Sequence, residues 1–375
     1  MRIVVLGSVA LPVPPPMQGG TERVAHAQAV GLSKKGHEIM LIAAKGSQPS
    51  YQYQLVEIGG GDTVAGSFVL SSRPPSRDPE QEKDGFRVKP GMTQNTEPVE
   101  SSRKLRKEML SLSLVDFWLD VHASEYDCVL NNMRGGEVLF FETARRLGKK
   151  YANVMHLPMF ADLADACRQL KIPLVSISNA QRVPFPDLNY VGTVYNGIDI
   201  ADFLFEKNPD DYLLMMGSIT PHKNQKTGIS VAKSVGIKLV IAGKIGDASY
   251  YAKEIAPHVD GKTVIHHGEI GMSEKVRLYG KAKALLFPVL WEEPFGLVMI
   301  EAMACGTPVI AFRRGAVPEV VADGKTGFIV ENESQMIEAV KKIDQIDRTT
   351  CRKHVEGHFT NDHMVESLEK VVTSL

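Results

Sequence analysis

The chain has 375 residues, of which 43% are hydrophobic and 23% are charged, the proportions of an ordinary globular protein of two or three domains. Its formal net charge of −1 excludes a global basic field, so the chain as a whole attracts neither nucleic acid nor an anionic membrane. A bound anion must therefore be held by local groups.

Cysteine use and hydropathy indicate a cytoplasmic protein. The four cysteines (Cys128, Cys167, Cys305 and Cys351) form no Cys-x-x-Cys pair, so we expect reduced packing residues. The opening run MRIVVLGS is too short for the apolar region of a signal peptide. No window approaches 18 apolar residues without a charge, so no membrane span is expected.

The first 45 residues predict a strand, a helix and a second strand. Residues 2–8 are a β-rich run, and a Pro/Gly-rich loop follows it. Residues 21–36 have apolar side chains at helical spacing, with Thr21 as the expected N-cap and Gly36 as the stop. Residues 37–45 read as a buried strand. This βαβ order predicts a parallel sheet.

Beyond this unit, the N-terminal domain is expected to extend to residue 200. Prolines, glycines, serines and charges make 46–100 a predicted loop-rich excursion. Helical periodicity returns at 103–122, where the helix is basic at its start and apolar later. We interpret it as a core helix with a solvated charged face, and peripheral contact with the inner face of a membrane is the alternative. Short buried runs then predict strands at 126–132, 151–156 and 172–178.

A second alternating series follows a turn at Asn196-Gly197 and a charged linker. It predicts a second domain over 201–355 and a terminal helix over 356–375 that packs back on the N-terminal domain. The predicted strands are 212–218, 237–244, 263–269, 283–289, 308–312 and 327–330. The predicted helices are 224–236, 249–259, 273–282, 296–306 and 316–324. The fold class is therefore α/β, with two Rossmann-like domains facing each other across a ligand-binding cleft.

Two carboxylates, Glu293 and Glu301, mark the end of one strand and the helix after it. Between them, Pro294-Phe295-Gly296 is expected at the N-terminus of the helix, where backbone N–H groups lack partners. Such a helix start suits a phosphate, and a nearby carboxylate suits sugar hydroxyls. The alternative is a solvated Glu293 and an exposed Glu301.

The stretch EEPFGLVMIEAMACGTPVIAFRRGAVPEVVADGKTGFIV resembles the donor site of the GT-B retaining glycosyltransferases (glycosyl transferases group 1, family 4), in which the two carboxylates form an E-x7-E pair. GGTERV near the N-terminus resembles the Gly-Gly loop of that family, and NGID its inter-domain turn. MGSITPHKN resembles its phosphate loop and HHGEI its base-side loop. The resemblance covers most of the chain apart from residues 46–130.

The resemblance implies roles for individual residues. Glu301 would bind the ribose hydroxyls of a nucleotide donor, and Glu293 a hydroxyl of the transferred sugar. Lys223 would pair with the diphosphate and stabilise it as leaving group. His156 would face the sugar. The remaining donor-binding positions are Gly19, Gly20, Ser218, Glu269, Ile270 and the backbone N–H groups of Phe295, Gly296 and Leu297.

Each implied role has a plainer alternative. Lys223 could be a solvated surface lysine, His156 a structural residue, and the Gly19-Gly20 pair a simple turn. Ser218 stands where the family commonly has Arg, so a diphosphate ligand is missing, and His222, Arg313 or Arg314 are candidates to replace it. His26, His266, His267 and Cys305 are interpreted as structural.

The resulting prediction is a retaining hexosyltransferase that moves a sugar from a UDP- or GDP-linked donor to a sugar, lipid-linked or small-molecule acceptor. No HExxH, DxD or carboxylate cluster occurs, so no cofactor and no metal are expected. The alternatives are a non-hydrolysing nucleotide-sugar epimerase and a catalytically silent nucleotide-sugar-binding protein. A Rossmann dehydrogenase is disfavoured because the first strand is not followed by GxGxxG.

Overall fold

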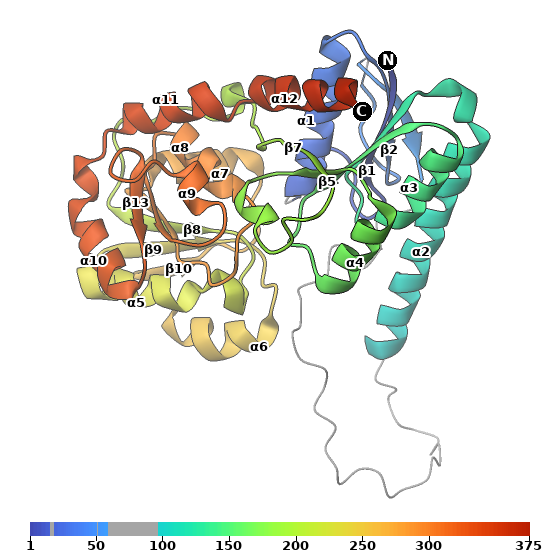
Figure 1. The fold of residues 1–375 in the computed structure, drawn as a ribbon. Helices are drawn as coiled ribbons and strands as arrows, with labels where there is room; N and C mark the ends of the chain where they lie inside the picture. Colours follow the sequence, from blue (N-terminus) through green and yellow to red (C-terminus); the bar gives the residue numbers. More distant parts are fainter. Residues whose placement is uncertain (16–18, 51, 59–96) are drawn as a thin grey trace, which may run out of the picture.

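Two parallel β-sheets form the two halves of the protein (Figure 1). The computed structural model describes residues 1–15, 19–50, 52–58 and 97–375, with side chains from residue 105 onward in the last range. Within these residues the N-terminal sheet has seven strands: β1 (Arg2–Ser8), β2 (Glu38–Ala43), β3 (Gln54–Glu57), β4 (Cys128–Asn131), β5 (Lys150–Met155), β6 (Leu174–Ser176) and β7 (Tyr190–Thr193). Its helices are α1 (Gly20–Lys34), α2 (Glu97–Val121), α3 (Glu137–Arg146) and α4 (Ala161–Leu170).

The C-terminal half has a smaller sheet of the same kind. Its strands are β8 (Tyr212–Met216), β9 (Lys238–Ala242), β10 (Val264–His266), β11 (Ala284–Phe287), β12 (Val309–Phe312) and β13 (Gly327–Val330). The helices of this part of the chain are α5 (Gln225–Val235), α6 (Ala248–Tyr250), α7 (Met272–Lys281), α8 (Leu297–Ala304), α9 (Val317–Val320), α10 (Glu333–Lys342), α11 (Arg348–His358) and α12 (Asn361–Ser374).

The strand orders place a ligand crevice in each half. They are β3-β2-β1-β4-β5-β6-β7 and β10-β9-β8-β11-β12-β13, and the paired strands run parallel. The direction of winding reverses between β1 and β4 and between β8 and β11. Ligands of open α/β sheets bind outside the carboxyl ends of strands at such a reversal. A ligand site is thus expected at the loops after β1, β4, β8 and β11.

The central strands are apolar runs because helices cover both faces of each sheet. Ile3, Val4, Val5 and Leu6 of β1 are all fully buried, although neighbouring side chains point to opposite faces. Continuous burial of this kind is what the sequence predicted for these strands. The four cysteines are also buried and free, as predicted.

The chain crosses between the halves twice, and the two crossings are hydrogen-bonded to each other. The Ile198 amide donates to the Phe359 carbonyl (3.0 Å), and the Asn361 amide donates to the Ile198 carbonyl (2.9 Å). A Cβ on Gly197 would stand 2.2 Å from the Thr360 carbonyl oxygen, so only glycine fits at this crossing. After the second crossing α12 lies against α1 (Figure 1).

Several predicted elements need correction. α1 begins at Gly20 after Gly19, so Thr21 is inside the first turn and is not the N-cap. The predicted helix 249–259 is divided into α6, a π-helical turn and a 3-10 turn, the last containing Pro257. α9 is a single turn.

The range 46–100 is not wholly loop. It contains β3 and the start of α2, and β3 pairs with β2. Residues 51 and 59–96 of this range lie outside the described residues. β7 was also not predicted, because its half-buried sequence, YVGT, has no apolar run.

Candidate functional site

The start of α8 forms the centre of the candidate site. The loop after β11 ends at Gly296, whose φ of 84° is in the left-handed region that favours glycine. A Cβ on Gly296 would also stand 2.6 Å from Met299 Cε. α8 begins at Leu297, and the first N–H groups of a helix have no partner within it. The helix start can therefore donate several hydrogen bonds to an anion.

Glu293 is buried just before α8, and one of its carboxylate oxygens accepts two hydrogen bonds. Lys223 Nζ lies 2.6 Å from Glu293 Oε2, and Trp291 Nε1 donates to the same oxygen at 3.0 Å. The Ala316 amide donates to the Glu293 carbonyl at 2.9 Å, which fixes the backbone. The carboxylate is therefore part of a fixed polar cluster, which argues against a solvated loop residue.

Lys223 comes to this cluster from the loop after β8. The Lys223 ammonium lies 5.1 Å from the ring centroid of Trp291 and 5.3 Å from that of Phe287, within the range of cation–π attraction. Burial lowers the pKa of the neighbouring His222, and the Lys223 charge lowers it further. His222 is therefore neutral near pH 7, so it does not replace the missing Arg as a cation.

Glu301 is buried within α8 rather than exposed. Lys275 Nζ lies 2.7 Å from its carboxylate, and the Tyr279 hydroxyl donates to Oε2 at 2.8 Å. Burial, and then the Glu301 charge, raises the pKa of Tyr279 well above its usual range. The second carboxylate is thus held by two side chains of α7.

A hollow of about 180 Å³ lies between the two halves at the start of α8. The N-terminal half brings Gly20 close to it, since a Cβ on Gly20 would be 3.1 Å from Leu297 Cδ1. The residues lining the hollow are Gly20, Thr21, Val24, His156, Ile177, Asn196 and Glu293 to Leu297. The start of α1 and the segments after β5, β6, β7 and β11 therefore meet in one small space.

His156 follows β5 directly and lines this hollow. Its Nε2 lies 2.7 Å from Asn132 Oδ1, and Asn132 follows β4. Burial, with a smaller effect of the Arg134 charge, lowers the pKa of His156 to about 3. The imidazole is therefore neutral at pH 7 and can act as a hydrogen-bonding group rather than as a cation.

The other predicted donor-binding residues lie outside the lining of this hollow. Gly19 precedes α1, where a Cβ would be 2.7 Å from Pro15 Cγ. The Ser218 carbonyl accepts a hydrogen bond from Gln225 Nε2 (3.0 Å). Glu269 is exposed after β10, and Ile270 packs against the core.

The two arginines offered as substitutes for the missing Arg have carboxylate partners. Arg313 lies 2.7 Å from Glu331, and Arg314 lies 3.3 Å from Glu292. The backbone of Lys244 is hydrogen-bonded next to Ser218, because the Ile219 amide donates to the Lys244 carbonyl at 2.9 Å. Lys244 follows the carboxyl end of β9, next to the loop after β8.

Sequence reasoning missed Trp291, Asn132, Lys275 and Tyr279. Trp291 and Asn132 each follow a buried strand, which is a signal that could have been used. Lys275 and Tyr279 have the i, i+4 spacing of one helix face, but nothing in the sequence indicates that this face meets α8.

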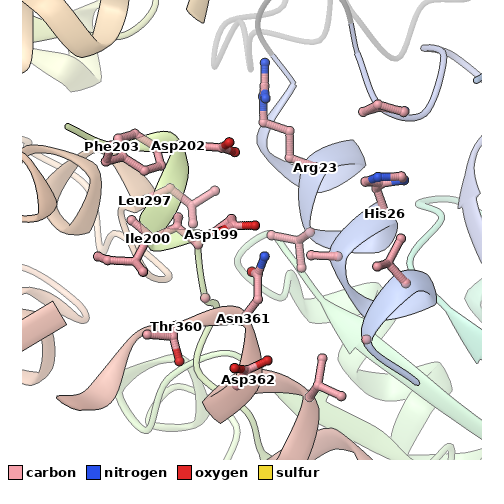
Figure 2. A pocket seen from close by; sticks show the side chains of 18 of the residues that line it. Arg23, His26, Asp199, Ile200, Asp202, Phe203, Leu297, Thr360, Asn361 and Asp362 are labelled. Carbon is pink, nitrogen blue, oxygen red and sulfur yellow. The ribbon is translucent and has the colours of Figure 1, made fainter. Parts of the chain in front are cut away.

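A second hollow, of about 490 Å³, lies between α1 and the two crossings (Figure 2). Arg23 lies on α1, with Asp199 and Asp202 on the opposite wall (Figure 2). Burial, and then the Asp199 charge, raises the pKa of Asp202, whereas the Arg23 charge opposes this rise. Leu297 lines both hollows, so the second one continues the site toward the crossings.

In the part of the chain that the structure describes, no helix is both long and apolar enough to cross a bilayer.

The fold is the GT-B fold of glycosyltransferases. AviGT4, a glycosyltransferase involved in avilamycin A biosynthesis, aligns with a TM-score of 0.70 at 19% identity, over 100% of this chain and 97% of that one. Anabaena HepE, solved with UDP and glucose, aligns with a TM-score of 0.69 at 14% identity over the whole of both chains. At such identities the likeness establishes the fold alone.

The C-terminal half matches the model of a known family. Residues 199–352 match the model of the glycosyl transferases group 1, the family that the resemblance indicated. The O-antigen chain mannosyltransferase RfbU of Salmonella typhimurium is 31% identical over 171 residues, which are 44% of this chain and 48% of RfbU. The chain thus spans about half the length of such curated relatives.

Proposed function

We propose that the protein transfers a hexose from a UDP- or GDP-linked donor to an acceptor hydroxyl, with retention at the anomeric carbon. The observation that carries the proposal is the Lys223–Glu293 contact of 2.6 Å at the start of α8, beside the hollow between the two halves. A cation and a helix N-terminus together suit a diphosphate, and the buried carboxylate suits a sugar hydroxyl. The family match and the UDP and glucose bound by HepE support the same donor class.

The proposed reaction breaks the bond between the anomeric carbon and the diphosphate oxygen. The acceptor oxygen bonds to that carbon on the same face, and its proton passes to the departing diphosphate. Lys223 and the N–H groups of Phe295, Gly296 and Leu297 would stabilise the charge that develops on the leaving group. We propose that these groups suffice without a metal, so chelation with EDTA should leave transfer unchanged.

The two carboxylates and His156 have separate proposed roles. Glu293 Oε2 already accepts from Lys223 and Trp291, so we assign Oε1 to a hydroxyl of the transferred sugar. Glu301 is assigned to the ribose, which would share it with Lys275. Neutral His156 is assigned to a second sugar hydroxyl, with Asn132 fixing the ring.

Thermal shift against UDP, GDP and ADP, with wild type and Lys223→Ala, tests the donor site. A ligand at about a hundred times its dissociation constant adds roughly 2.7 kcal/mol, enough to move the midpoint by several degrees. We expect one nucleoside diphosphate to shift the wild type and to shift Lys223→Ala much less. Lys226→Ala is the matched control, because Lys226 lies on the same segment and pairs with Glu254.

The absence of a shift with any nucleoside diphosphate would contradict the donor site itself. A shift without transfer to any acceptor would favour a silent binding protein, which Ser218 in place of the usual Arg also suggests. Conversion of the free nucleotide sugar without an acceptor would identify an epimerase.

A further inference from the structure

Helix α2 has two apolar faces, only one of which the fold buries. Leu112, Val115 and Leu119 pack into the core of the N-terminal half. On another face, Leu110, Leu114, Phe117 and Val121 are between 46% and 64% exposed. These four residues, called here the α2 stripe, recur at steps of four, three and four, so they align along one side of the helix.

The α2 stripe is a continuous exposed feature. Leu105 and Met109 add exposed apolar surface beside it. Figure 1 shows α2 along the outer edge of the N-terminal half, away from the C-terminal sheet. Scattered exposed apolar residues need no explanation, but a contiguous patch marks an interaction surface.

The charges of α2 indicate what covers the stripe. Arg106 and Lys107 are exposed one turn before Leu110, and Arg103 and Lys104 precede them in the sequence. The later carboxylates are engaged or turned away: Asp120 lies 2.9 Å from Arg146, and Glu108 and Asp116 are half-buried. The exposed side is therefore cationic at one end and apolar over the rest.

We propose that the α2 stripe docks on the surface of an anionic lipid bilayer. Apolar side chains of a surface-lying helix enter the boundary between headgroups and acyl chains, while adjacent basic residues contact anionic headgroups. A second copy of the chain fits less well, because it would cover Arg106 and Lys107, and from residue 105 to residue 121 of α2 this face offers no unpaired carboxylate to them. The inference is independent of the proposed glycosyl transfer.

Flotation with vesicles tests this docking, using the full chain. Wild type should float with vesicles of phosphatidylcholine mixed with phosphatidylglycerol, and should stay free with phosphatidylcholine alone. Leu114→Gln/Phe117→Gln and Arg106→Glu/Lys107→Glu should each weaken the bound fraction at least tenfold. Phe160→Gln is the matched control and should bind like wild type, because Phe160 is 60% exposed against 64% for Phe117 but lies before α4.

Three results would overturn the proposal. The first is a wild type that stays free of the anionic vesicles, or that binds neutral ones equally well. The second is a fall of several degrees in the thermal midpoint of Leu114→Gln/Phe117→Gln, which would mean that the stripe packs within its own chain. The third is a dimeric wild type that this variant converts to a monomer, which would identify a second copy as the partner.

Discussion

Glu293 is the residue on which the candidate site depends most. Its carboxylate is buried, and its Oε2 is shared by Lys223 and Trp291, which come from different parts of the C-terminal half. A buried charge of this kind is tolerated because its partners satisfy it. The same pairing keeps Lys223 directed toward the start of α8.

Glu293→Gln should lower the proposed transfer by roughly a hundredfold, the size seen when a group that stabilises developing charge is lost, because Lys223 would no longer be fixed where it acts on the leaving group. The amide keeps the shape of the side chain but no longer holds the Lys223 ammonium by charge. Initial rates with the donor found by thermal shift would measure the loss. Glu292→Gln is the control, because the side chain of Glu292 is exposed and pairs with Arg314; an equal loss in both variants would contradict the assigned role.

His156 should make stability fall as the pH is lowered from about 6.5 toward 3. In the folded chain burial lowers its pKa to about 3, whereas an unfolded histidine titrates near 6.5. In this window the unfolded chain binds a proton that the folded chain does not, which favours unfolding. Thermal midpoints from pH 7 to pH 4 should therefore fall less steeply in His156→Asn than in wild type, and parallel curves would refute the expectation.

At the scale of elements, the first residue of α11 is hydrogen-bonded to several segments around α8, and both α11 and α7 pack against α8. Arg348, in its first turn, is buried and donates to the carbonyls of Glu206, Gly280 and Ala282 at 2.6–2.9 Å. It also donates to the Thr307 hydroxyl at 2.8 Å. The guanidinium thus caps the C-terminus of α7, where carbonyls lack partners and the helix dipole favours a cation.

Arg348→Met should destabilise the protein by about 3 kcal/mol or more, because three carbonyls and a hydroxyl would be left buried without their donor. Urea unfolding monitored by circular dichroism would measure the change. Lys353→Met, in the same helix but exposed, should cost little. Equal midpoints for the two variants would mean that water replaces the guanidinium.

At the scale of the whole molecule, the two halves are joined by the paired crossings and by Glu319. This residue of α9 accepts from the amides of Asn179 and Ala180 (2.8 and 2.7 Å) and from the Tyr195 hydroxyl (2.8 Å). Burial, and then Glu319, raises the pKa of Tyr195 to about 12, so its hydroxyl remains a donor near pH 7. One carboxylate of the C-terminal half therefore holds a turn of the N-terminal half.

Glu319→Ala should allow the halves to open, because it removes about 2 kcal/mol of charge-assisted hydrogen bonding between them. Small-angle scattering should then give a larger radius of gyration for the variant than for wild type. Glu338→Ala is the control, since Glu338 pairs locally, with Lys341 at 2.6 Å. An unchanged radius in Glu319→Ala would show that the crossings alone fix the arrangement.

The sequence alone predicted the alternation of buried strands and amphipathic helices, and hence the two α/β halves. It could do so because these signals are local: apolar runs such as Ile3 to Leu6, a glycine at a helix start, and polar residues just after a strand. The resemblance to known donor sites depended on the same short stretches. Thr21 as a cap and a single helix over 249–259 were wrong, because competing local geometry decided those boundaries.

The tertiary structure alone decided which of these residues meet. Lys223 and Glu293 are 70 residues apart, and only the adjacency of β8 and β11 brings their loops together. The burial of Glu301 under Lys275, and the contact of Glu319 with the other half, depend likewise on the packing of distant elements. Periodicity along a chain reports which face of an element is buried, but it does not report what that face is buried against.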